Sequence, residues 1–71
     1  MPRDEWEIKR LLKDGISQAV SADDFDEWQL KRFVRSAVEG DTTVIISDSD
    51  QLDVYVIRRI AREGKDNVVF R

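Results

Sequence analysis

The stretch DEWQLKRFVRSAVEGDTTVIISDSD, residues 26–50, contains one complete helix-then-strand unit. In its first part, apolar side chains recur on one face of a helix at about 100° per residue, and Gly40 ends this pattern. The segment TTVIIS, residues 42–47, is β-branched and apolar on both faces, which is typical of a central strand. This unit predicts an α/β fold in which helices alternate with strands.

The helical part of this unit occurs three times in the chain. Every copy has Asp first, an aromatic residue third, Ile or Leu fifth, and basic residues sixth, seventh and tenth. Each helix opens acidic and closes basic, which matches the helix dipole. These features predict three amphipathic helices that end at glycines. The copies are DEWEIKRLLK (4–13), DEWQLKRFVR (26–35) and DVYVIRRIAR (53–62), and they lead to Gly15, Gly40 and Gly64.

A candidate strand follows each glycine, over residues 16–20, 42–47 and 67–71, and the outer two are typical of edge strands. Short connections with right-handed crossovers would make the sheet parallel, with the strand order 1-2-3. We therefore predict a single αβαβαβ domain over residues 1–71. Both crossover helices would then lie on one face of the sheet, and we expect the first helix, residues 4–13, to cover the other face.

A second arrangement is compatible with the first part of the chain. A single helical stripe would also account for its apolar residues, and residues 16–20 would then be helix in an ααβαβ fold. Gly15 costs such a helix about 1 kcal/mol, whereas Ser17 and Gln18 make ISQAV a weak strand. The recurrence of the unit favours the strand. The stripe comprises Ile8, Leu11, Leu12, Ile16, Ala19 and Val20.

The composition of the chain excludes several classes of site. Its 71 residues include no cysteine and no histidine, which excludes disulfides, thiolate zinc sites and His-dependent catalytic triads. No stretch approaches the roughly 20 apolar residues of a membrane span, and residues 1–5 do not have the layout of a signal peptide. We therefore expect no membrane partner and a cytoplasmic protein, or one made in an expression host if the sequence is designed.

Four aspartates follow two of the predicted strands. Asp23 and Asp24 come after the first strand, and Asp48 and Asp50 come after the second. Ligands of α/β sheets usually bind at the carboxyl ends of the strands, and neighbouring strand ends are about 5 Å apart. These carboxylates could therefore share a Mg²⁺ or Mn²⁺ ion that activates water for attack on a phosphodiester. Helix capping and the helix dipole explain the same aspartates with no cofactor at all.

Three segments within residues 13–70 resemble the interior of the PIN-like nuclease superfamily. They are KDGISQAVSADD, EGDTTVIISDSD and AREGKDNVVF. The NYN branch has a similar strand that ends in Ser-Gly-Asp-Ser-Asp, and the flap-type 5′ nucleases have a Glu-Ala-Asp-Asp helix start and a later Asp-x-Asp. The resemblance implies that the two aspartate pairs correspond to these acids, and that a divalent metal assists cleavage of RNA or DNA. The superfamily's first strand and its metal-binding Asp have no counterpart in this chain.

Aromatic and basic residues share a second line on each predicted helix, away from its apolar face. Such a line can stack bases and hold phosphates, which suggests a nucleic acid or another acidic partner. Intrahelical cation–π contacts explain the same spacing without a ligand. Nucleic acid is not the favoured partner, because the net charge of the chain is −3. This aromatic–basic stripe comprises Trp6, Arg10, Trp28, Arg32, Arg35, Tyr55, Arg59 and Arg62.

These residues assign no catalytic function. The regular caps, dipole order and short loops favour a small folding scaffold or interaction module without enzymatic activity, of natural or de novo designed origin. The first alternative is a metal-dependent nuclease-like module that uses the four aspartates. The second alternative is a binder of nucleic acid or an acidic partner that uses the aromatic–basic stripe. The sequence identifies no specific partner.

Overall fold

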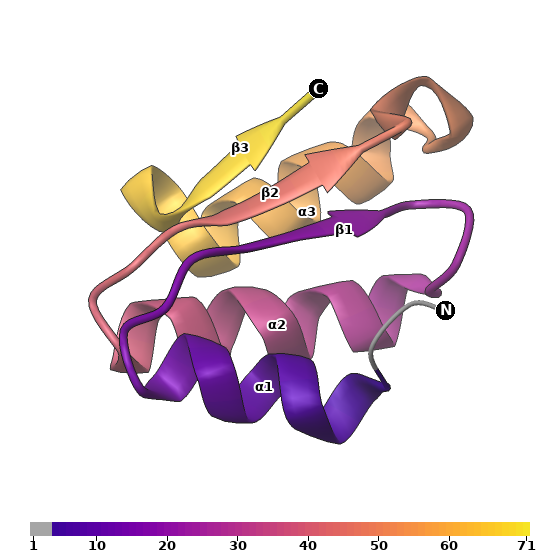
Figure 1. Cartoon of the computed structure of the whole chain (residues 1–71). Coiled ribbons are helices and arrows are strands. Elements are labelled where there is room, and N and C mark those ends of the chain that lie inside the picture. The colour runs from indigo at the N-terminus through magenta and orange to yellow at the C-terminus, as the bar shows by residue number, and fades with distance from the viewer. Residues whose placement is uncertain (1–3) are drawn as a thin grey trace.

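The structure, a computed structural model, describes residues 4–71 as three α-helices that alternate with three strands. The strands form one parallel sheet in the order β1-β2-β3 (Figure 1). This confirms the predicted αβαβαβ fold, and the ααβαβ alternative is wrong because β1 pairs with β2 along its length. In chain order the elements are α1 (Glu5–Lys13), β1 (Gln18–Ser21), α2 (Glu27–Glu39), β2 (Val44–Ser47), α3 (Val54–Gly64) and β3 (Val68–Phe70).

Aspartate side chains cap the starts of all three helices. Asp4, Asp26 and Asp53 each accept a hydrogen bond from a backbone N–H in the first turn of the helix. At Asp26 the bonding is reciprocal, since Gln29 accepts a hydrogen bond of 2.9 Å from the Asp26 N–H. The first residue of every sequence copy is therefore an N-cap, and each cap contributes about 1 kcal/mol.

The helix ends differ in part from the expected glycine stops. Gly15 has a φ of +86° after α1, whereas after α2 and α3 the positive φ falls on Asp41 (52°) and Lys65 (49°), which follow the other two glycines. Gly64 is required for packing instead, because a Cβ there would lie 2.2 Å from Cγ1 of Val34. Gly15 therefore serves a left-handed backbone conformation, whereas Gly64 serves the close packing of α3 against α2.

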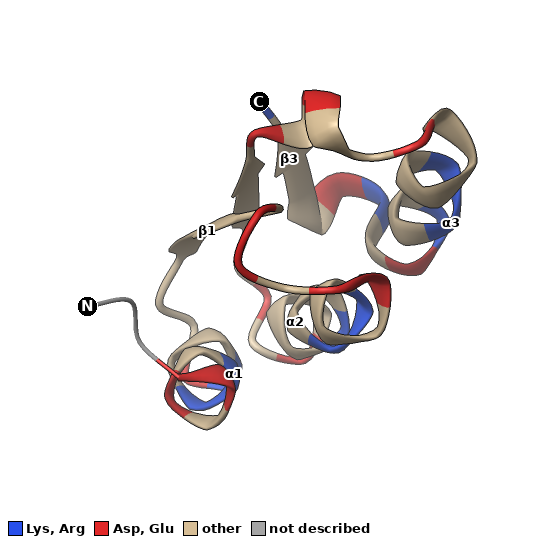
Figure 2. Ribbon diagram, turned by 90° about the vertical axis from the view of Figure 1, so that its right-hand side faces the viewer, with Lys and Arg blue, Asp and Glu red and all other residues tan. Residues whose placement is uncertain are grey.

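All three helices cover the same face of the sheet (Figure 1, Figure 2). α1 packs beside α2, and α2 lies between α1 and α3. The expectation that the first helix covers the opposite face is therefore wrong. A Cβ on Gly40 would lie 1.8 Å from the carbonyl oxygen of Leu12, so a glycine lets the ends of α1 and α2 approach closely enough to share one layer.

The core lies between the sheet and the helix layer. Val44 and Ile46 of the central strand are fully buried, and so is Phe33 of the central helix. Phe33 also contacts Phe25 edge-on, with ring centroids 4.8 Å apart. The core side chains are Ile8 and Leu12 of α1, Val20 of β1, Ala22, Leu30, Phe33, Val34 and Ala37 in and before α2, Val44 and Ile46 of β2, Ile60 of α3 and Val68 of β3.

The opposite face of the sheet, which we call the open sheet face, has no helix over it in residues 4–71 (Figure 1). Ala19, Ile45 and Val69 form one row across it, because Ile45 is in register with both of the others. Ala19 and Val69 are exposed and Ile45 is half-buried. Parallel sheets are usually covered by helices on both faces, whereas in residues 4–71 helices cover one face of the sheet. Within residues 4–71, none of the helices has the length and apolar character that a membrane crossing requires.

Candidate functional site

The predicted acidic site lies where β1 and β2 end. Ser21 and Ser47 are in register there across the two strands. The Ser21 hydroxyl donates a hydrogen bond of 2.7 Å to Oδ2 of Asp48 and accepts one of 3.1 Å from the backbone N–H of Asp23. A single hydroxyl group therefore ties together the loops that follow the two strands.

The four predicted metal ligands are exposed side chains in these loops. Figure 2 shows acidic positions in the loops between strands and helices and at the helix starts. Within residues 4–71, no group of three or more acidic side chains is placed to hold a metal ion. The metal site therefore stays a prediction, and the contact that joins the two loops is the Ser21–Asp48 hydrogen bond. The predicted ligands are Asp23, Asp24, Asp48 and Asp50.

The aromatic members of the stripe form a row on the outer face of the helix layer, which we call the aromatic row. Trp6, Trp28 and Tyr55 are 69%, 68% and 65% exposed. Each is the second residue of its helix, so the row crosses the layer from α1 to α3. Nζ of Lys31 lies 5.2 Å from the centre of the Trp28 ring, whereas the stripe predicted an arginine in such a contact. The row is therefore solvated and is not part of the core.

Three arginines of the stripe form ion pairs between neighbouring helices, and two of these pairs repeat the same positions of the sequence copies. Arg32 of α2 lies 3.0 Å from Glu5 of α1, and Arg59 of α3 lies 2.7 Å from Glu27 of α2. Both pairs join the second residue of one sequence copy to the seventh residue of the next, and we call them the helix ladder. The third copy has Val54 at the second position, so the ladder ends at α3.

Hydrogen bonds in these ion pairs keep the carboxylates charged. Two hydrogen bonds from Arg59 are the main cause that lowers the pKa of Glu27 from 4.5 to about 2. Arg35 of α2 donates to both carboxylate oxygens of Glu63 on α3, at 3.0 and 3.3 Å, and this lowers the pKa of Glu63. Both arginines are therefore occupied by acids of a neighbouring helix.

Glu5 has partners on two helices. Its carboxylate accepts hydrogen bonds from Gln29 at 3.1 Å and from Arg32 at 3.0 Å, and Nζ of Lys9 lies 3.4 Å away. These donors, with Gln29 the largest cause, lower the pKa of Glu5. Since Gln29 also closes the cap of α2, the starts of α1 and α2 are fixed to each other.

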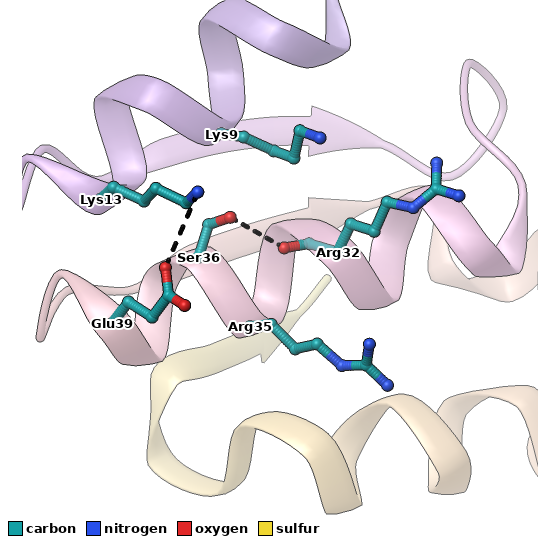
Figure 3. A pocket seen from close by; sticks show the side chains of 6 residues that line it. All are labelled: Lys9, Lys13, Arg32, Arg35, Ser36 and Glu39. Atoms are coloured by element: carbon teal, nitrogen blue, oxygen red, sulfur yellow. Dashed lines mark hydrogen bonds and ion pairs between the residues drawn. The ribbon is translucent and has the colours of Figure 1, made fainter.

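A cationic groove of about 190 Å³ lies between α1 and α2 (Figure 3). Ser36 donates a hydrogen bond of 3.0 Å to the carbonyl of Arg32, and Lys13 lies 3.9 Å from Glu39. Arg35 extends away from α1 toward α3 in Figure 3. The groove can attract an anion, and both of its arginines already bind glutamates. Its lining residues are Lys9, Lys13, Arg32, Arg35, Ser36 and Glu39.

Sequence reasoning found the arginines of the stripe and missed their partners. Helical periodicity relates residues three or four apart, whereas the ladder pairs are 27 and 32 residues apart. The available signal was a glutamate at the second position of the first two copies. Among the described residues, Arg10 pairs only with Asp14, the C-cap of its own helix, at 3.6 Å, and Arg62 has no ion pair.

The aromatic row, the helix ladder and the Ser21–Asp48 contact are the features that bear on function. No family model, no curated protein and no solved structure matches the chain. The three side chains of the aromatic row are 65–69% exposed, so most of their surface lies outside the packed structure.

Proposed function

We propose that this chain is a small interaction module without a catalytic role, and that it binds a protein partner through the aromatic row. The observation that carries the proposal is the two-thirds exposure of Trp6, Trp28 and Tyr55 at equivalent positions of three neighbouring helices. Side chains so exposed contribute little to the core, and Trp and Tyr are among the residues that dominate binding energy at protein interfaces. Rigid helices also present such a row in a fixed arrangement.

A protein partner fits the charges of this surface better than nucleic acid does. Arg32, Arg35 and Arg59 are each held by a glutamate of a neighbouring helix, so a phosphate group would have to displace a carboxylate. The net charge of −3 adds long-range repulsion. We therefore assign the arginines to holding the helix layer rigid and the aromatic row to binding.

The hydrogen bonds of the serines support a role other than nucleophilic catalysis. Ser17, Ser36 and Ser49 each donate to a backbone carbonyl oxygen. A serine nucleophile instead needs a neighbouring base that accepts its proton. Because the chain has no cysteine, it needs no oxidising compartment to fold, and we propose the cytoplasm, or an expression host if it is a designed scaffold, as its location.

A metal-dependent nuclease-like module is the second candidate, and the Ser21–Asp48 contact favours it. The PIN-like resemblance implies that acids from two neighbouring strand ends meet at one ion, and the 2.7 Å hydrogen bond joins the same two loops. The remaining aspartates would have to turn toward Asp48 when the ion binds. A Mn²⁺-specific rise in melting temperature would favour this candidate over the interaction module.

The triple variant Trp6→Ser/Trp28→Ser/Tyr55→Ser tests the proposed function. Because all three side chains are exposed, its free energy of unfolding in urea should stay within about 1.5 kcal/mol of the wild-type value. Phe33→Ala is the matched control, since it truncates a fully buried aromatic side chain and should cost about 3–5 kcal/mol. A loss of that size in the triple variant would mean that the row serves folding, which contradicts the proposal.

A further inference from the structure

Two arginines of α3 have no acidic partner within residues 4–71. Arg58 and Arg62 are exposed and form no ion pair there, whereas every other lysine and arginine of the three helices pairs with a glutamate or an aspartate. They lie two residues before and after the fully buried Ile60, about 160° away from it around the helix. Both side chains therefore point away from the core and are available to an acid outside the described chain.

One change in the third sequence copy explains why Arg58 is unpaired. In the first two copies, the second and sixth residues are a glutamate and a lysine that form an ion pair within the helix, at 3.4 Å in both cases. In the third copy these positions are Val54 and Arg58. The basic residue is therefore kept, while its acidic partner is replaced by an apolar side chain.

These side chains form one surface with the α3 member of the aromatic row. At 100° per residue, Val54, Tyr55, Arg58 and Arg62 lie within about 100° of one another around α3, and we call them the α3 patch. Val54 and Tyr55 are 67% and 65% exposed. Arg58 and Arg62 are four residues apart, so two like charges lie side by side, which is unfavourable on a helix. The patch thus combines two unpaired positive charges with an apolar and an aromatic surface.

We propose that the α3 patch binds an acidic segment of the protein partner, in which two carboxylates lie beside an apolar side chain. This inference rests on the proposed function, because it gives the chemical character of the partner at the α3 end of the aromatic row. A guanidinium group can donate two hydrogen bonds to one carboxylate, as Arg59 does to Glu27. The apolar side chain of the segment covers Val54 and Tyr55.

The α3 patch suits such a segment better than a nucleic acid. A nucleic acid carries a phosphate at every nucleotide and gains affinity from several phosphate contacts, whereas the patch offers two guanidinium groups. The net charge of −3 repels a polyanion along its whole length. A segment with two carboxylates meets much less of this repulsion, and its apolar side chain gains contact with Val54.

Titration with a synthetic peptide, followed by NMR, tests the inference. The probe is a helical peptide of about 15 residues, built from Ala, Leu and Glu, with two Glu residues four positions apart beside a Leu. The control peptide has Gln in place of both Glu residues. Up to about 1 mM peptide, the acidic peptide should shift the Nε–H signals of Arg58 and Arg62 and the amide signals of α3. The control peptide should shift them much less.

Three variants locate the binding site on α3. Arg58→Gln/Arg62→Gln should bind the acidic peptide about tenfold more weakly. Val54→Glu should also weaken binding, because it gives Arg58 a carboxylate from its own helix, as in the first two copies. Arg10→Gln/Lys13→Gln is the matched control, since it removes the same charge from α1, where both side chains pair with acids, and it should bind like the wild type. All five side chains are exposed, so the variants should fold, which urea unfolding checks.

Unshifted α3 signals at about 1 mM peptide, equal binding of the two peptides, or equal losses in the two double variants would overturn the inference. Single-stranded RNA that shifts the arginine signals when the acidic peptide does not would overturn it in favour of nucleic acid. Normal folding of the aromatic-row triple variant would then leave the proposed function standing with a partner of other chemistry. Unfolding of that triple variant would contradict the proposed function whatever the peptide does.

Discussion

Arg59 of α3 donates two hydrogen bonds, of 2.7 and 3.0 Å, to the two carboxylate oxygens of Glu27 on α2. The corresponding pair of Arg32 and Glu5 joins α2 to α1. These two contacts connect all three helices, so they make the helix layer a single surface on which the aromatic row is held.

The Arg59–Glu27 pair predicts a pH dependence of stability. Because the folded-state pKa of Glu27 is lowered, its contribution to stability is present above pH 4.5 and is lost as the pH falls toward about 2. Glu27→Gln should therefore flatten the curve of unfolding free energy against pH in this window. Arg59→Gln should flatten it too, because the carboxyl then loses its main partner. Urea unfolding measures the curve, and an unchanged slope in both variants would mean that the pair does not persist in solution.

The close approach of α1 and α2 predicts a large cost for a methyl group at Gly40. In Gly40→Ala the new Cβ would lie 1.8 Å from the backbone oxygen of Leu12, so the helix ends must separate, at a cost of about 3 kcal/mol. Gly64→Ala is the comparison, because its Cβ would lie 2.2 Å from a side-chain atom of the buried Val34 and not from backbone; a β-branched side chain in a helix has little rotational freedom, so a loss of about 1–3 kcal/mol is expected. Urea unfolding that shows no loss for Gly40→Ala would contradict the packing of α1 beside α2.

Local sequence patterns were sufficient to predict the alternation of helices and strands. Each copy carries its own apolar face, and the β-branched segment at residues 42–47 has the composition of a central strand. They could not predict which face of the sheet α1 covers. The apolar positions Ile8 and Leu12 show that α1 buries one side, and a 1-2-3 strand order is compatible with either face. The deciding contact is long-range, between Gly40 and the carbonyl of Leu12.

The positions of the candidate site residues could be predicted from the sequence, but the contacts of their side chains could not. The sequence located the acids after β1 and β2, but the directions of their side chains depend on the loop conformation. Asp48 has a left-handed φ of 56°, and its carboxylate accepts a hydrogen bond from the hydroxyl of Ser21, 27 residues earlier. The stripe located Arg35, but its availability depends on Glu63, 28 residues later. Such partners arise only when the helices pack, so helical periodicity does not report them.

Mn²⁺ is expected to stabilise the chain no more than an ordinary salt does. The melting temperature should rise by a few degrees at most in millimolar Mn²⁺, and NaCl of equal ionic strength should reproduce the rise. Asp48→Asn removes the charge from the Ser21 hydrogen bond and should cost about 1 kcal/mol without changing this response. A Mn²⁺-specific rise of about ten degrees or more that Asp48→Asn abolishes would instead support the nuclease-like module.

Short single-stranded RNA is expected not to bind at near-physiological salt. Arg32 and Arg59 are held by glutamates, so stacking on Trp6 or Trp28 would lack the phosphate contacts that normally accompany it. Titration should give no saturable quench of tryptophan fluorescence. A quench that saturates, weakens steeply with salt and disappears in Arg10→Ala/Arg32→Ala would make nucleic acid the partner.

The exposure of the aromatic row, on which its assignment as a binding surface depends, is tested most directly by acrylamide quenching of the tryptophan fluorescence. Trp6 and Trp28 are 69% and 68% exposed, so we expect acrylamide to quench the folded chain nearly as strongly as it quenches the urea-unfolded chain. Much weaker quenching of the folded chain would mean that the tryptophans are covered, and it would contradict the assignment of the aromatic row as the binding surface.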